Sequence, residues 1–453
     1  MAIKKLKEYK NKIKSDGFWN TLFKNSFWAF AGDASASLIG LIITILLIRI
    51  TGSSNYGILI LAQTYMNIID VSLNVQSWKS VIQYGQKSLT NNKIDDLCSY
   101  IKLGTILDVS TAILGCIAAI LIAPIIGKLL GWSKILIICA QIFSIEIISH
   151  FSGTPTAMLR ILNKFNLVAL QKFITAIIKL TSIIMILILN KNLPLIYVTI
   201  IYCLTDIIGN ILLIVFAFYT FKKKYSNTKI FKSKMPTDSK LFINFTLWVT
   251  LSEIVDIPVN YFDMFIISVL GNDKVAIFKV FKQCVAILQK VASPIQQAIL
   301  PQFSELSAKN EKNRGYRIVI KIRNAMLNTI TPISLIIGIT SPLWLNILYG
   351  QEYACYWYVL LIYLLVQTYA LSYTTIHSYF LSLDKSKESA IIVLISNIIY
   401  FICAYLLVNK TGMLGMVLSF ALQAFLVINL KKKEILKEGV KYEWGNSCWW
   451  QSS

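Results

Sequence analysis

Several lysines of this 453-residue sequence lie inside long apolar segments, where their charge could do chemistry. A charged group is costly inside a membrane, so it is kept for pairing or for function. Helical spacing places Lys172 and Lys179 on one face. Lys279 and Lys290 share a second face, and Lys282 lies near it. Because a compact ammonium binds phosphate well, these five lysines are candidate ligands for an anionic substrate.

Carboxylates inside the apolar segments form a second set of candidates. Glu253 and Asp256 are three residues apart, and Asp256 shares a helical face with Asp263. Asp70 lies in another apolar segment. These four residues could carry H⁺ or bind Na⁺ and so couple transport to an ion gradient. The alternative, that lysines and carboxylates only pair to hold helices together, stays open.

Motifs of other chemistries are absent from the sequence. It contains no GxxxxGK[ST] phosphate loop, no HExxH and no GxSxG, and its eight cysteines form no CxxC. We expect no catalytic residue, no metal site and no cofactor, and hence not an enzyme. The two histidines, His150 and His377, are expected to serve in packing or hydrogen bonding.

The elements that carry these residues are apolar helices. Hydrophobic residues make up 56% of the chain and charged residues 15%, and the mean hydropathy is +0.63. A soluble chain of this size needs about a quarter of its residues charged. The sequence therefore predicts an all-α polytopic membrane protein, with apolar runs of about 20 residues that can cross a bilayer. We expect about 12 transmembrane helices, near residues 26–50, 56–83, 98–127, 134–157, 167–190, 193–220, 241–270, 274–301, 317–340, 354–383, 390–409 and 411–430.

The net charge of +22 reflects topology and not a nucleic-acid partner. Lysines and arginines gather at alternate span ends, together with both termini, so both termini are expected to be cytoplasmic. A weak repeat aligns Gly52 with Gly271 and indicates two pseudo-symmetric six-helix lobes. The expected division is a basic amphipathic arm (1–25), an N-lobe (26–221), a basic linker (222–240), a C-lobe (241–430) and a tail (431–453).

Four motifs at span junctions resemble those of one transporter family. They are IRITGSSNYGI at 48–58, YFDMFIISVLGNDKVAIFK at 261–279, LPQFSELSAKNEK at 300–312 and ILYGQEYACYW at 347–357. In this order they resemble the Wzx-type polysaccharide repeat-unit flippases of the multidrug/oligosaccharidyl-lipid/polysaccharide exporter superfamily. Arg49 matches the first motif and joins the candidate substrate ligands. The sequence departs from the family pattern at Val275-Ala276, where many members have Gly-x-Tyr nearby.

The resemblance implies a MATE-like fold with two lobes that open alternately to each side of a bacterial inner membrane. It also implies a substrate, an undecaprenyl-pyrophosphate-linked oligosaccharide, moved to the outer leaflet for O-antigen or capsule biosynthesis. H⁺ or Na⁺ would be the coupling ion. Membrane lipids and polysaccharide polymerase machinery would be partners. Three alternatives remain: an ion-coupled multidrug antiporter of the same superfamily, a lipid II flippase, and a scaffold of the polysaccharide machinery.

Overall fold

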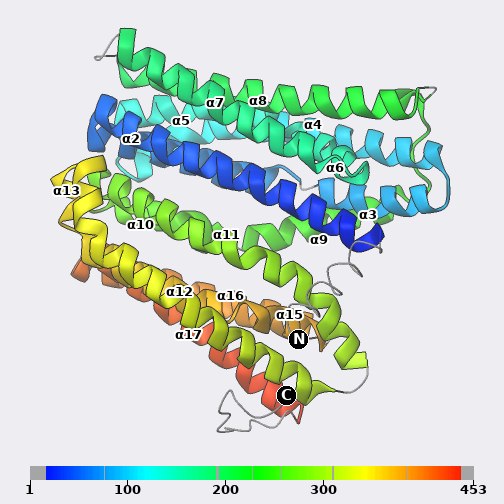
Figure 1. The fold of residues 1–453 in the computed structure, drawn as a ribbon. Coiled ribbons are helices and arrows are strands. Elements are labelled where there is room, and N and C mark those ends of the chain that lie inside the picture. Colours follow the sequence, from blue (N-terminus) through cyan, green and yellow to red (C-terminus); the bar gives the residue numbers. More distant parts are fainter. Residues whose placement is uncertain are drawn as a thin grey trace. The chain divides into compact units, whose positions relative to one another are not determined.

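The computed structural model describes residues 17–75, 77–189, 193–226, 228–255, 257–308, 311–383 and 385–439. Most of the basic arm and of the tail lie outside these residues. The described residues form helices joined by short connections (Figure 1). The chain divides into two compact units, unit 1 (Met1–Gln283) and unit 2 (Cys284–Ser453). The lobe boundaries expected from the sequence stay a prediction.

Unit 1 holds the helices that correspond to the first seven expected spans. They are α2 (Gly17–Leu73), α3 (Ser77–Thr90), α4 (Ile94–Leu129), α5 (Lys134–Glu146), α6 (Gly153–Ile161), α7 (Phe165–Leu189), α8 (Leu195–Lys224), α9 (Ser239–Val255) and α10 (Asp263–Ser268). A 3-10 turn, η1 (Ile147–Ser152), joins α5 to α6, and a shorter one, η2 (Ile230–Lys232), follows α8. The π-helical turn η3 (Pro258–Phe262) joins α9 to α10. Within this unit α2 packs along α7, and α3 along α4.

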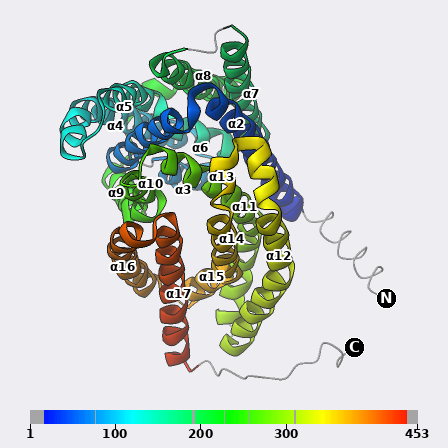
Figure 2. The same cartoon turned by 90° about the vertical axis from the view of Figure 1, so that its left-hand side faces the viewer.

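Unit 2 begins within α11 (Asn272–Ala308) and contains the remaining helices. They are α12 (Lys312–Tyr349), α13 (Gln351–Ala354), α14 (Trp357–Ser372), α15 (Thr374–Ser382), α16 (Ser386–Thr411) and α17 (Met413–Lys437). Figure 2 shows the same helices from another direction. Within the unit α12 packs on α14, and α16 on α17.

The number of membrane-spanning helices agrees with the prediction of about twelve. Among the described residues, nine helices are long and apolar enough to cross a membrane, and the bent pair formed by α9 and α10 adds a tenth. Two of the twelve expected spans are not among these ten helices. The second half of α2 is counted with the first half, and α11 is long enough but carries several lysines. The all-α polytopic class is therefore confirmed.

Glycines break the chain at the two positions that the repeat aligned. Gly52 has φ 79° and ψ 161°, which divides α2 into two spans. Gly271, between α10 and α11, has φ 109°. A side chain is unfavourable at such positive φ values, whereas glycine adopts them freely. The aligned glycines therefore serve the same purpose, a sharp turn between two consecutive spans.

Side chains on the helix surfaces divide into a packed face and an exposed apolar face. One packed cluster joins α3, α4, α6 and α8 around Val81, Ile101, Leu159 and Ala217. On α4 the opposite face exposes large apolar side chains, namely those of Ile106, Ile113, Leu114, Ile117, Leu121 and Ile125. Exposed apolar surface of this extent is expected where helices meet lipid.

Candidate functional site

A largely buried ion pair of unit 1 joins α7 and α8. The Nζ atom of Lys179 donates to both carboxylate oxygens of Asp206 over 2.6 Å. The side chains are 13% and 19% exposed. The same ammonium lies 3.7 Å from the centre of the Tyr202 ring, one turn before Asp206. Two apolar helices thus hold one charged pair and one aromatic face between them.

A histidine lies between two carboxylates beside this pair. Nδ1 of His150, on η1, is 2.8 Å from Oδ2 of Asp70 on α2. Its Nε2 is 3.4 Å from Oε1 of Glu146 on α5, one turn earlier in the chain. A neutral imidazole has one N–H donor, and a carboxylate only accepts. Both contacts can be hydrogen bonds only when the imidazole holds two protons or one carboxyl group is protonated.

Amide and hydroxyl groups extend this network. Asn74 donates from Nδ2 to Oδ1 of Asp70 over 3.0 Å. Asn210, on α8, donates to the Ser149 hydroxyl over 2.8 Å. Asp108, on α4, is 1% exposed and accepts hydrogen bonds from the backbone N–H and the hydroxyl of Thr154. These bonds replace the water that the buried polar groups would otherwise need.

A polar cavity of about 280 Å³ opens against the network. It is lined by Asp70, Asn74, Val75, Trp78, Asp108, His150, Ser152, Gly153 and Asn210. This volume holds several water molecules, and its polar atoms provide partners for them. Inside a bundle of apolar helices, such a cavity gives small polar species a place next to titratable groups. We name the residues Asp70, Glu146, His150, Lys179 and Asp206 the unit 1 charge network.

Three further ion pairs hold candidate residues of unit 1. Lys172 on α7 donates to Asp33 on α2 over 2.5 Å. Lys282 on α11 donates to Asp263 on α10 over 2.5 Å and to the carbonyl oxygen of Asn260 over 2.7 Å. Lys79 on α3 donates to Glu253 on α9 over 2.5 Å. The pairing that the sequence left open as an alternative is thus present in the structure.

The other candidate residues occupy separate places. Arg49 is exposed near the end of the first half of α2. Lys279 is half-buried on α11, one turn before Lys282, with no ion pair to another described residue. Lys290 lies further along α11, in unit 2. Asp256 lies outside the described residues. The substrate and ion roles of all these residues stay predictions.

The candidate site expected from the sequence did not include three residues of the unit 1 charge network, namely Glu146, His150 and Asp206. Glu146 and Asp206 were recognisable as acids within apolar spans, but no sequence spacing links Asp206 to Lys179. The i, i+4 spacing of Glu146 and His150 was a visible signal. The expected hydrogen-bonding role of both histidines is confirmed, since His377 contacts Lys431 at 3.0 Å.

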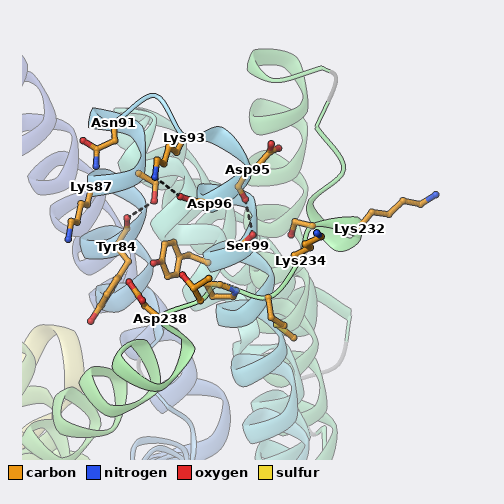
Figure 3. A pocket seen from close by; sticks show the side chains of 16 residues that line it. Tyr84, Lys87, Asn91, Lys93, Asp95, Asp96, Ser99, Lys232, Lys234 and Asp238 are labelled. Atoms are coloured by element: carbon orange, nitrogen blue, oxygen red, sulfur yellow. Dashed lines mark hydrogen bonds and ion pairs between the residues drawn. The ribbon is translucent and has the colours of Figure 1, made fainter.

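A second cavity lies at the lysine-rich end of unit 1 (Figure 3). It measures about 690 Å³ and lies between the α3–α4 turn and residues 232–238. Its charged lining mixes both signs, with Lys87, Lys93, Lys232 and Lys234 beside Asp95, Asp96 and Asp238. Lys102 anchors the 232–238 segment by a 2.8 Å hydrogen bond to the Ser233 carbonyl oxygen. The mixed lining favours neither an anion nor a cation.

Comparison with known proteins then fixes the family. Residues 10–307, more than half of the chain, match the family described as "Polysaccharide biosynthesis protein". The chain belongs to this family. The match confirms the family resemblance drawn from the four motifs at span junctions.

Two curated relatives align with part of this family member. One is the inner membrane protein YghQ of Escherichia coli K12, 27% identical over 158 residues, which are 35% of this chain and 44% of the relative. The other is named "Putative O-antigen transporter" of Shigella flexneri and is 30% identical over 192 residues, 42% of this chain and 45% of the relative. The chain therefore spans less than half the length of either relative in these alignments.

Two solved structures share the fold. An inward-facing multidrug resistance MATE family transporter superposes with a TM-score of 0.73 at 12% identity, over 90% of this chain and 96% of its own. The lipid II flippase MurJ, in an inward closed conformation, gives 0.67 at 15% identity, over 90% and 87%. At this identity the likeness establishes the fold alone. The MATE-like fold expected for the polysaccharide biosynthesis family member is thereby confirmed.

Proposed function

We propose that this protein is a flippase for undecaprenyl-pyrophosphate-linked oligosaccharide repeat units. It would move them from the cytoplasmic to the outer leaflet of a bacterial inner membrane by alternating access, for O-antigen or capsule biosynthesis. Membership of the polysaccharide biosynthesis family and the likeness to the Shigella protein support this cargo. The observation that carries the proposal is the unit 1 charge network beside a polar cavity within apolar helices.

The cargo explains why charge is kept inside the membrane. A pyrophosphate joined to sugars cannot cross about 30 Å of hydrocarbon unaided, because it would lose its hydration. Lysines held by carboxylates can exchange those partners for phosphate oxygens at little change in total charge. Lys172, Lys179 and Lys282 are proposed to act in this way, with Lys279, Lys290 and Arg49 adding positive charge along the path.

Replacing Lys179, Lys282 and Lys290 together by glutamine tests this role. We expect the triple variant to reach the membrane and to lose at least about tenfold in the rate of lipid-linked oligosaccharide transfer, since about 1.4 kcal/mol is tenfold. Lys134→Gln changes an exposed lysine of unit 1 and serves as the control. Wild-type transfer in the triple variant would refute the role of these lysines.

Ion coupling is proposed for Asp70 through its contact with His150, and for Glu253 and Asp263 through exchange of their lysine partners. Asp256, which lies outside the described residues, stays a candidate from the sequence alone. Arrival of a proton at the Asp70–His150–Glu146 group would change how many hydrogen bonds it can form. Asp70→Asn and His150→Gln are each expected to remove the dependence of transfer on an imposed pH gradient. Asp95→Asn, an exposed acid of unit 1, should leave it unchanged. If transfer follows a Na⁺ gradient and ignores pH, the proton role of this group is wrong.

The function itself is tested by depleting the protein and measuring the sidedness of lipid-linked oligosaccharide. The flippase proposal requires complete repeat units to accumulate on the cytoplasmic leaflet while surface polysaccharide falls. The alternative is a multidrug antiporter, which shares the fold. That alternative requires normal lipid-linked sugars and accumulation of a cationic dye in depleted cells. Partners would be membrane lipids and the polymerase machinery, and the protein would be a carrier and not an enzyme.

A further inference from the structure

Cations of unit 2 converge on one tyrosine hydroxyl. Arg323, on α12, donates from Nη1 to the Tyr373 hydroxyl oxygen over 3.1 Å. Lys432, on α17, donates from Nζ to the same oxygen over 3.0 Å. The Lys432 ammonium also lies 4.3 Å from the centre of the Tyr373 ring. Tyr373 lies between α14 and α15. Helices α12 and α17 thus each bring one positive charge to its hydroxyl oxygen.

A third cation lies next to Lys432 in the chain. Lys431 is 2% exposed, and its Nζ lies 3.0 Å from Nδ1 of His377. A charged ammonium only donates, so a charged Lys431 requires Nδ1 of His377 to be the acceptor in this contact. A buried lysine normally has a carboxylate partner. No carboxylate among the described residues forms an ion pair with Lys431 or Lys432.

Two carboxylates close to Lys432 in the chain, those of Glu434 and Glu438, are paired with other lysines. Glu434 pairs with Lys437 at 2.5 Å. Glu438 pairs with Lys312 at 3.0 Å and with Lys385 at 2.9 Å. Positive charge therefore accumulates around Tyr373. A cluster of cations at the end of membrane-spanning helices attracts anionic groups of lipids.

The Tyr373 hydroxyl adds a donor to this charge. Its oxygen accepts hydrogen bonds from Arg323 and Lys432 and still carries its own proton. An anionic oxygen could accept that proton while lying beside a guanidinium and an ammonium. Such charge-assisted hydrogen bonds are stronger than those between neutral groups, and arginine pairs well with phosphate. The arrangement offers three different donors to one tetrahedral anion.

We propose that Arg323, Tyr373 and Lys432 form a binding site for the phosphate group of a lipid, with Lys431 supplying further positive charge. The site extends the proposed function, and it rests on that function only where the phosphate comes from the carried lipid. The phosphate belongs either to the pyrophosphate of the carried lipid or to an anionic phospholipid of the membrane. Both sources present the same chemistry to this cluster.

Equilibrium binding in nanodiscs of phosphatidylcholine tests the site without requiring transport. The probe is a fluorescent isoprenyl pyrophosphate added to the full-length protein. We expect the R323Q/K432Q variant to bind it at least about tenfold more weakly, and Tyr373→Phe to bind it about threefold more weakly. Lys433→Gln removes one positive charge from an exposed neighbour of Lys432 and should change binding less than about twofold. Thermal unfolding of each variant checks that it remains folded.

Competition by phosphatidylglycerol distinguishes the two sources. Displacement of the probe at equal concentration assigns the site to membrane phospholipid, and failure to displace it assigns the site to the carried lipid. Either result supports a lipid phosphate site. Wild-type affinity in a folded R323Q/K432Q variant would overturn it, as would equal losses in K433Q. Depletion results that refute the flippase would leave this binding measurement unaffected.

Discussion

Lys179 and Asp206 show how buried charge is balanced in unit 1. Each would be costly alone in an apolar surrounding, and their 2.6 Å contact offsets that cost. A buried pair of this kind adds little net stability, but loss of one partner leaves the other charge uncompensated. The residues of the network are therefore coupled, so that single substitutions and double substitutions differ in effect.

Asp206→Asn is expected to lower the free energy of unfolding by about 3 to 5 kcal/mol, because it leaves the Lys179 ammonium buried without its counter-charge. The double variant K179Q/D206N should recover much of that loss. Thermal unfolding in detergent measures both, with Asp95→Asn, at an exposed acid of unit 1, as a control of the same charge change as Asp206→Asn. Additive losses in the double variant would contradict the pairing.

Glu438 gives a pH-dependent prediction at the same scale. Hydrogen bonds from Lys385 and Lys312 lower the pKa of the Glu438 carboxyl group below its ordinary value. A lowered pKa contributes stability above the ordinary value, and that stability is lost as pH falls through the lowered one. The difference in melting temperature between wild type and Glu438→Gln should thus be constant above about pH 5 and shrink below about pH 4. A difference that grows on acidification would refute this assignment.

Close helix packing in unit 1 depends on small residues. Gly57, early in the second half of α2, lies against the backbone at the start of α11. A methyl group at Gly57 would come within 1.9 Å of the carbonyl oxygen of Asn272. The backbone there cannot yield as a flexible side chain would. The close contact between α2 and the start of α11 is therefore possible because Gly57 has no side chain.

Gly57→Ala is expected to destabilise unit 1 by about 1 to 3 kcal/mol or more, because the helices must separate to admit the methyl group. Gly40→Ala is the matched control on the same helix, since a methyl group there meets nothing within 4 Å. The control should be neutral or slightly stabilising, as alanine favours helix over glycine. The melting temperatures of the two variants test this prediction. Equal values would contradict the close contact at Gly57.

The whole molecule has a predicted orientation, with the lysine-rich ends in the cytoplasm. Cys355 is exposed and follows α13, at the end of the expected span 354–383 that the sequence places outside. A membrane-impermeant maleimide should therefore label Cys355 in intact cells. A cysteine introduced at the exposed Lys433 should react only after permeabilisation. Cys355→Ser provides the background, and the reverse labelling pattern would show that the orientation is inverted.

The sequence by itself determined the class, the spans and the family. Apolar runs of about 20 residues predict membrane helices because an unpaired backbone cannot lie in lipid. The helix-breaking glycines Gly52 and Gly271 were visible as an aligned pair. These features are local, or repeat at a regular spacing, so one-dimensional information is sufficient to find them.

Only the tertiary structure decided which charges meet. Lys179 and Asp206 are on different helices, and His150 contacts Asp70 from eighty residues away. The cations around Tyr373 come from α12, α17 and the α14–α15 junction. Helical phase shows which face a side chain occupies, but not which helix lies opposite. The packing of the helices determines which helix lies opposite. It therefore also determines whether a charged side chain meets an opposite charge.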